Sequence, residues 1–199
     1  MLYKKALYLE YFTVGYNILE GALSILAGWL AGSIALIGFG LDSGVESLSG
    51  GVLLWRLFKH GKITEEEEER IEKKAVRLVG VSFFILGAYV LFESIRKLYL
   101  QERPEPSLFG IIIALFSLVI MPILSYSKYT TAKKIASRSL MADSRQTLVC
   151  SLLSAALLIG LGLNYLWGLW WADPASALVI VAFIFREGYE ALAEGKSCC

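Results

Sequence analysis

Six long apolar segments, separated by short polar connections, limit the folds open to this chain of 199 residues. A helix needs about 20 largely apolar residues to cross a hydrocarbon core of roughly 30 Å. Hydrophobic residues make up 56% of the chain and charged residues 19%, which is too apolar for most soluble folds. The sequence therefore predicts an all-α, polytopic membrane protein whose residues 1–199 form one domain of six transmembrane helices. The predicted spans are residues 7–30, 33–57, 76–98, 108–127, 140–163 and 173–190.

Prolines and one acidic residue mark the starts of two of these helices. Pro104 and Pro106 precede the fourth segment and must interrupt any helix there. Asp173 has the side chain of an N-cap, and Pro174 suits the first helical position. We therefore expect the sixth helix to begin at this pair.

The distribution of Lys and Arg predicts the orientation of the bundle, because cytoplasmic connections retain an excess of these residues. Fifteen of the 19 lie at the N-terminus, in residues 56–77 and 128–138, or after Phe185, and all these places fall on one side. Both termini are therefore expected in the cytoplasm, and the chain is expected to be a multi-pass protein of a prokaryotic plasma membrane. The net charge of +1 provides no basic field for binding nucleic acid.

Two polar segments lie outside the predicted spans. The connection 59–74 holds five consecutive glutamates at 65–69, followed by basic residues. It predicts a solvated helix that extends the third span into the cytoplasm, with a cation-collecting surface as the alternative. The tail 191–199 ends in Cys198 and Cys199, which could capture metal, carry a lipid or have no role.

Ionisable residues within the spans are the strongest functional signal, because acids in a membrane are expensive and tend to line polar pathways. Asp42 and Glu46 lie four residues apart on one face of the second helix, so both carboxylates could bind one cation. The alternative is that they only hold helices together through hydrogen bonds. Glu20, with Tyr16 and Asn17, could either complete the pathway or make a protonated contact between helices.

The fifth segment carries a second polar face. Asp143, Gln146 and Cys150 follow a spacing of three and then four residues, which places them on the same side of a helix. If this side faces Asp42 and Glu46, the thiolate, the amide oxygen and the two carboxylates make a four-ligand site that zinc accepts. Asp143 could form the cytoplasmic entrance or pair with Arg145.

One further acid, Glu93, lies late in the third span and close to a predicted membrane face. Arg96 and Lys97 follow it by three and four residues. We therefore expect an interfacial ion pair here rather than part of the pathway.

Three stretches resemble the cation diffusion facilitator family of six-span exporters of divalent metal ions. SIAL at 33–36 followed by DSGVES at 42–47 resembles the family's second-helix motif. The Ala-Asp pair at 142–143 with Gln146 and Cys150 falls on its fifth-helix motif, and WWADPASA at 170–177 resembles the start of its sixth helix. The resemblance implies metal ligands at Asp42, Glu46, Gln146 and Cys150. It also implies a short form without the cytoplasmic C-terminal domain, and a homodimer formed through the membrane helices.

These observations together predict a transporter. The expected function is export of cytoplasmic zinc, or of cadmium, iron or manganese, by proton antiport with alternating access past Asn17, Glu20 and Asp143. No cofactor is expected. The alternative is a non-transporting membrane regulator, scaffold or metal buffer. An enzyme is not expected, because the single histidine, His60, lies beyond the second span and no nucleophile–base pair is visible.

Overall fold

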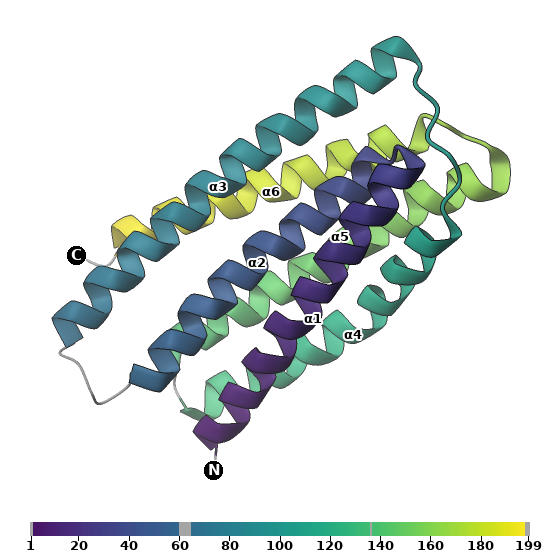
Figure 1. The fold of residues 1–199 in the computed structure, drawn as a ribbon. Helices are drawn as coiled ribbons and strands as arrows, with labels where there is room; N and C mark the ends of the chain where they lie inside the picture. Colours follow the sequence, from purple (N-terminus) through teal and green to yellow (C-terminus); the bar gives the residue numbers. More distant parts are fainter. Residues whose placement is uncertain (1, 60–64, 136, 198–199) are drawn as a thin grey trace.

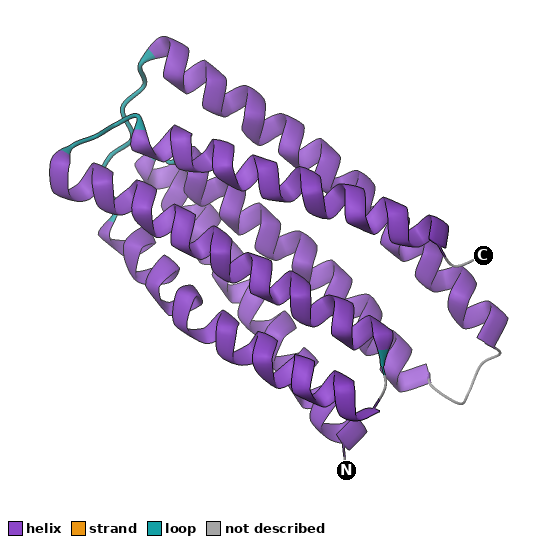
Figure 2. Ribbon diagram, turned by 180° about the vertical axis from the view of Figure 1, so that it is seen from behind, coloured by secondary structure: helices purple, strands orange, loops and turns teal. Residues whose placement is uncertain are grey.

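The computed structural model of the chain describes residues 2–59, 65–135 and 137–197. These residues form six helices and no strand (Figures 1 and 2), which confirms the all-α prediction for the described part. The described residues 32–33, 101–107 and 168–171, which lie between helices, form turns or extended connections. Cys198 and Cys199, and residues 60–64 of the predicted polar connection, lie outside the described residues. The helices are α1 (Leu2–Ala31), α2 (Ile34–Lys59), α3 (Glu65–Leu100), α4 (Leu108–Ile135), α5 (Arg138–Trp167) and α6 (Ala172–Ser197).

The helices form an elongated bundle in which chain neighbours run in opposite directions (Figure 1). Helix α1 packs against α2 and α4, and α4 packs against α5, while α3 and α6 form a pair that meets the rest through α2 and α5. The two ends of the chain lie at the same end of the bundle, and the α1–α2, α3–α4 and α5–α6 connections lie at the other. This arrangement agrees with the predicted placement of both termini on one side, and the identity of that side stays a prediction.

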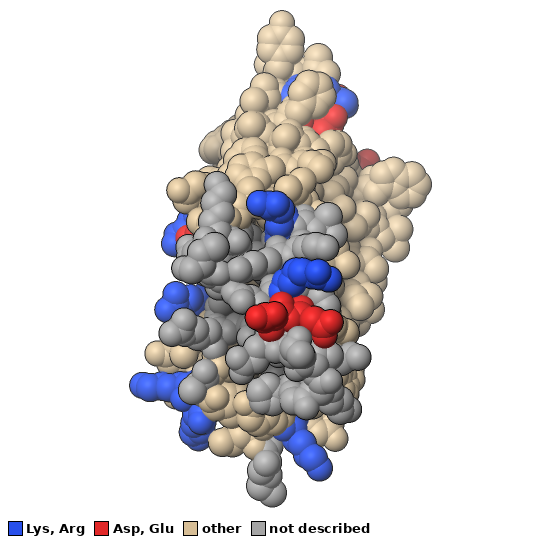
Figure 3. All heavy atoms as spheres, turned by 90° about the vertical axis from the view of Figure 1, so that its left-hand side faces the viewer, with Lys and Arg blue, Asp and Glu red and all other residues tan. Residues whose placement is uncertain are grey.

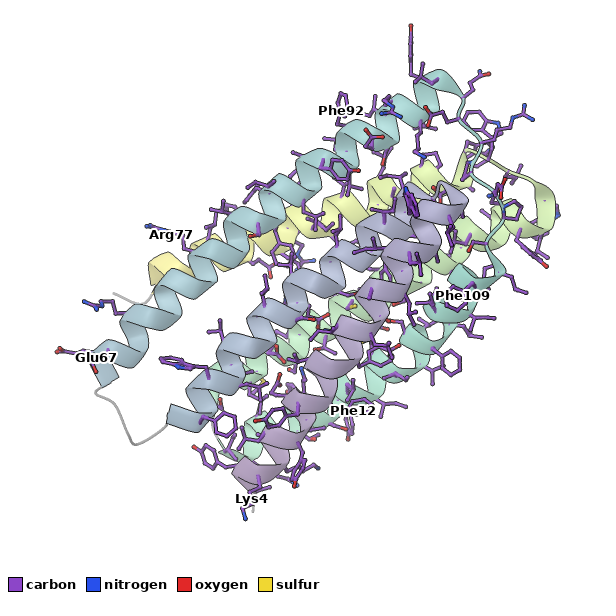
Figure 4. The ribbon with its side chains drawn as sticks, in the orientation of Figure 1. Lys4, Phe12, Glu67, Arg77, Phe92 and Phe109 are labelled. Carbon is purple, nitrogen blue, oxygen red and sulfur yellow. The ribbon has the colours of Figure 1, made fainter. Side chains whose placement is uncertain are left out.

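The outer surface is apolar. Phe12, Phe92 and Phe109 point outward from three different helices in Figure 4, and among the described residues of the face shown in Figure 3 charged side chains stand in separate groups between uncharged ones. Three helical segments are long and apolar enough to cross a membrane by length and composition: Leu2–Ala31, Leu108–Ile135 and Asp143–Trp167. The predicted spans 76–98 and 173–190 fall within α3 and α6, and the predicted span 33–57 falls within α2 except for Ser33.

Two helices run further than the apolar pattern indicates. Helix α3 begins at Glu65 and is 36 residues long, so the glutamate run is helical, and Glu66 and Arg70 on it are exposed. Helix α4 continues to Ile135, eight residues past the predicted limit of its span. Lys128, which we expected in a cytoplasmic connection, therefore lies within the helix, and its side chain is fully buried.

The end of the bundle opposite the termini is closed by a polar contact between α2 and α6. The Ser33 hydroxyl donates to the Asp173 carboxylate, whose other oxygen accepts from the Ile34 amide at 3.1 Å. The prediction that Asp173 caps its own helix is wrong: α6 begins at Ala172, and the Trp171 carbonyl accepts its first helical hydrogen bond from Ala175. The Asp173 carboxylate is already engaged at the N-terminus of α2, where it satisfies an amide that the helix leaves unpaired.

Replacing Asp173 should therefore destabilise the protein although it lies outside the polar centre described below. Asp173→Ala leaves the Ser33 hydroxyl and the Ile34 amide buried without this acceptor, a loss of about 1–3 kcal/mol. We expect a lower thermal midpoint in detergent, measured by circular dichroism. Glu190→Ala, which removes an exposed ion pair with Arg186, is the matched control and should shift the midpoint little. Equal midpoints for the two variants would contradict this role.

Helices α1 and α2 approach each other closely where two glycines meet. A Cβ atom added at Gly40 would lie 2.9 Å from the Gly21 carbonyl oxygen, and one added at Gly21 would lie 2.9 Å from the Gly40 carbonyl oxygen. The contacting atoms belong to backbone and cannot rotate away. Small residues therefore set the distance between α1 and α2 at this point, as they do in many membrane helix pairs.

This contact predicts different effects of the same substitution at two positions on α2. Gly40→Ala should force the helices apart at a cost of about 1–3 kcal/mol, as other overpacked interiors do. Gly44→Ala should be tolerated, because no atom lies within 4 Å of its added Cβ. Thermal unfolding of both variants in detergent tests this. A Gly40→Ala protein as stable as Gly44→Ala would show that the interhelical distance is not fixed here.

Candidate metal site and polar pathway

The buried side of α1 is polar, which is the reverse of a helix in a soluble protein. Its apolar residues point outward, and its inward face places hydroxyl, amide and carboxylate groups along the bundle. These polar residues repeat every three or four positions, so they form one continuous line. The buried polar residues of α1 are Glu10, Thr13, Asn17, Glu20 and Ser24.

Asp42 and Glu46 lie one turn apart on α2, and both are buried, with 5% and 3% of their surface exposed. One oxygen of Glu46, Oε1, accepts a hydrogen bond from the Thr147 hydroxyl of α5 at 3.2 Å. The other oxygen, Oε2, has no hydrogen-bond partner among the described residues. A buried carboxylate oxygen without a partner is costly in a finished core, so this one is available to a ligand.

The predicted ligands on α5 occupy different environments. Cys150 is buried, and its side chain interacts with the Glu46 carboxylate. Gln146 is only partly buried, and its oxygen accepts a hydrogen bond from Ser49 at 3.4 Å. Within the described part of the chain, no three His, Cys, Asp or Glu side chains are close enough to hold a metal ion. The structure thus brings Glu46 and Cys150 together but shows no assembled metal site.

The residues predicted to line the pathway lie beside this centre. Glu20 Oε2 accepts a hydrogen bond from the Ser43 hydroxyl of α2 at 3.0 Å, whereas its Oε1 has no hydrogen-bond partner among the described residues. Asn17 is fully buried, and within the described structure neither its amide nitrogen nor its amide oxygen has a partner. Tyr16 also interacts with Glu20. Unpartnered polar atoms therefore extend from Glu46 toward α1.

The third predicted pathway residue, Asp143, belongs to a buried ionic cluster. Its carboxylate lies 2.5 Å from the ammonium of Lys128 on α4, and that ammonium also lies 3.2 Å from Glu10 Oε1 on α1. Asp143 thus pairs with Lys128, a partner that neither alternative for Asp143 included, while Arg145 is exposed. Sequence reasoning missed both Glu10 and Lys128. The signal that could have found them is helical spacing, because Glu10 is seven residues before Asn17.

Two further acids, Glu187 and Glu93, lie in different parts of the bundle. Glu187 on α6 is partly buried and lies close enough to Asp42 and Glu46 to interact with them electrostatically, and the sequence analysis did not single it out. Glu93 forms an ion pair with Arg96 at 3.0 Å near the end of α3, as the spacing predicted. Glu93 is therefore separate from the central acids.

Residues 12–197 match the family model described as the cation efflux transmembrane domain. The chain is 22% identical over 190 residues to Transmembrane protein 163 of Xenopus laevis, covering 95% of this chain and 66% of that protein. It is 24% identical over 203 residues to a cadmium, cobalt and zinc/H(+)-K(+) antiporter of Bacillus velezensis, covering 94% and 59%. It is also 27% identical over 179 residues to Metal tolerance protein 4 of Oryza sativa subsp. japonica, covering 84% and 43%. The chain thus spans less than two thirds of the length of these relatives.

Proposed function

This chain belongs to the cation efflux family, whose members are membrane transporters of cations rather than enzymes, and we propose that it exports a divalent metal ion, zinc foremost, from the cytoplasm. The observation that carries the proposal is the pair Asp42 and Glu46, buried at the centre of a bundle with an apolar exterior. The free oxygen Oε2 of Glu46 and the neighbouring Cys150 thiol supply the donors that a transported ion needs.

The donor set favours zinc or cadmium over magnesium or calcium. Asp42 and Glu46 supply carboxylate oxygens and Cys150 a soft sulfur, while Gln146 supplies a neutral oxygen. Because the oxygens outnumber the sulfur, iron and manganese remain candidates. Two ligands come from α2 and two from α5, so a change in how these helices pack would assemble or separate the set. This is the change that alternating access requires.

Proton antiport follows from the chemistry of the ligands. A thiolate and carboxylates bind metal in their deprotonated forms, so protons compete with the ion and favour its release on an acidic side. The proposal includes a multi-pass protein of a prokaryotic plasma membrane that forms a homodimer through its membrane helices. In this scheme Asn17, Glu20 and Asp143 line the path on either side of the central acids.

Zinc flux into sealed proteoliposomes with an imposed pH gradient tests the transport proposal. Asp42→Asn should lower the initial rate more than about tenfold, because it removes an ionised ligand. Glu93→Gln, which changes an acid paired with Arg96 away from the centre, should transport like the unmodified protein. Circular dichroism and size-exclusion chromatography show whether each variant is folded. Absence of flux of zinc, cadmium, iron and manganese by folded protein would instead support the non-transporting regulator, scaffold or metal buffer.

Cys150 should determine which metal is preferred. In Cys150→Ser the soft donor becomes a hydroxyl, so competition assays should show weaker transport of cadmium and zinc relative to manganese. The same assay across a range of pH tests the proton coupling, because Cys150 and Glu46 are the proposed sites of competition. Unchanged pH dependence in both Cys150→Ser and Glu46→Gln would show that the coupling assignment is wrong.

A further inference from the structure

Lys128 presents an ammonium group in a place where a membrane protein rarely keeps one. Its side chain has no exposed surface, although α4 carries two exposed lysines, Lys133 and Lys134, only five and six residues further along. A buried charge persists only where opposite charges and hydrogen bonds compensate for lost water. The groups around the Lys128 ammonium must therefore compensate for a positive charge that water does not reach.

That site is made by oxygen atoms from two other helices. The Lys128 ammonium lies 3.2 Å from Glu10 Oε1 and 2.5 Å from Asp143 Oδ2, and it donates to the Thr147 hydroxyl at 3.3 Å. Glu10 and Asp143 also interact directly with each other. Two carboxylates and a hydroxyl thus surround a single positive charge.

The cluster is not fully satisfied by the lysine. Lys128 donates a hydrogen bond to Glu10 Oε2, and the buried Oε1 of the same carboxylate, although it lies 3.2 Å from the ammonium, accepts no hydrogen bond from the described residues. The two carboxylates carry two negative charges, which a divalent ion would balance and a single ammonium does not. The ion could also bind the carboxylate oxygen that accepts no hydrogen bond from the ammonium. The donors are all oxygen atoms, which suits magnesium, calcium or manganese better than a metal that prefers sulfur.

The cluster is connected to the central acids through one side chain. The Thr147 hydroxyl lies 3.3 Å from the Lys128 ammonium and 3.2 Å from Glu46 Oε1. Glu10 lies nearer than Asn17 and Glu20 to the N-terminal end of α1, which is the predicted cytoplasmic end. An ion travelling from the cytoplasm to Glu46 would therefore meet this cluster first.

We propose that Glu10, Asp143 and Thr147 form a second cation site on the cytoplasmic side of the central acids, and that Lys128 occupies it as a tethered competitor. Its place in transport rests on the proposed function, but its capacity to bind a cation does not. A divalent ion that binds there displaces the Lys128 ammonium and reaches a position one hydroxyl away from Glu46. The oxygen donors make this site less selective among divalent ions than the centre containing Cys150.

Manganese binding to the full chain in detergent tests this directly. Binding is monitored by the loss of the electron paramagnetic resonance signal of the free manganese ion. The background is Asp42→Asn with Glu46→Gln, which removes the charge of the central acids. Adding Lys128→Met should raise manganese affinity at least about tenfold, because the competing charge is gone and two carboxylates remain. Adding Glu10→Gln to that protein should abolish the gain. Lys133→Met, an exposed lysine on the same helix, is the matched control and should leave affinity unchanged.

The outcomes separate this inference from the transport proposal. A gain with Lys128→Met in a protein whose unmodified form shows no metal flux would support the second site and contradict export. Flux without any such gain, in folded Lys128→Met protein, would overturn the second site and leave export standing. If Lys128→Met does not fold, Lys128→Gln replaces it, because its amide can still donate to Asp143. An equal gain with Lys133→Met would also overturn the inference, since general surface charge would then explain it.

Discussion

The burial of charged groups inside a bundle with an apolar exterior is the constraint on which the rest of this structure depends. Lipid cannot hydrogen-bond to a carboxylate or an ammonium, so each such group within a membrane must find its partners inside the protein. Lys128 finds three, from α1 and α5, and in doing so it ties α4 to both helices. The inward polar face of α1 and the outward apolar face of the same helix are two consequences of this one requirement.

Other contacts in the bundle have a purely structural role. At the end opposite the termini, Asp173 binds the start of α2 and closes the bundle with a fully used carboxylate. Along α1 and α2, glycine contacts fix the helix spacing. Asn17, Glu20 and Glu46, which all have buried polar atoms without a hydrogen-bond partner among the described residues, lie on the side of the glycine contact that faces the termini. The molecule therefore separates polar residues that hold the fold together from polar residues that remain available to a ligand.

The sequence predicted the six helices well, because runs of about 20 apolar residues leave few alternatives. It also singled out Asp42, Glu46 and Cys150 as candidate ligands, since acids and a thiol on a consistent helical face stand out in such runs. It failed where a residue's role depends on a distant partner. Lys128 looks like an ordinary loop charge until α4 is seen to continue past it, and Asp173 looks like a cap for its own helix until α2 is seen beside it. Whether Gln146 and Cys150 complete a metal site depends on how α2 and α5 pack, which helical spacing does not specify.

The length of α3 has a mechanical consequence. At about 1.5 Å per residue, its 36 residues extend for about 54 Å, compared with a hydrocarbon core of roughly 30 Å. About 24 Å of helix therefore projects beyond the core, most of it at the end that begins with the acidic run at Glu65. A rigid rod of this kind acts as a lever: a small tilt of its membrane-embedded part sweeps the acidic end through a much larger arc. Because α3 is paired with α6, rearrangement inside the bundle would be transmitted to the aqueous phase as a displacement of negative charge.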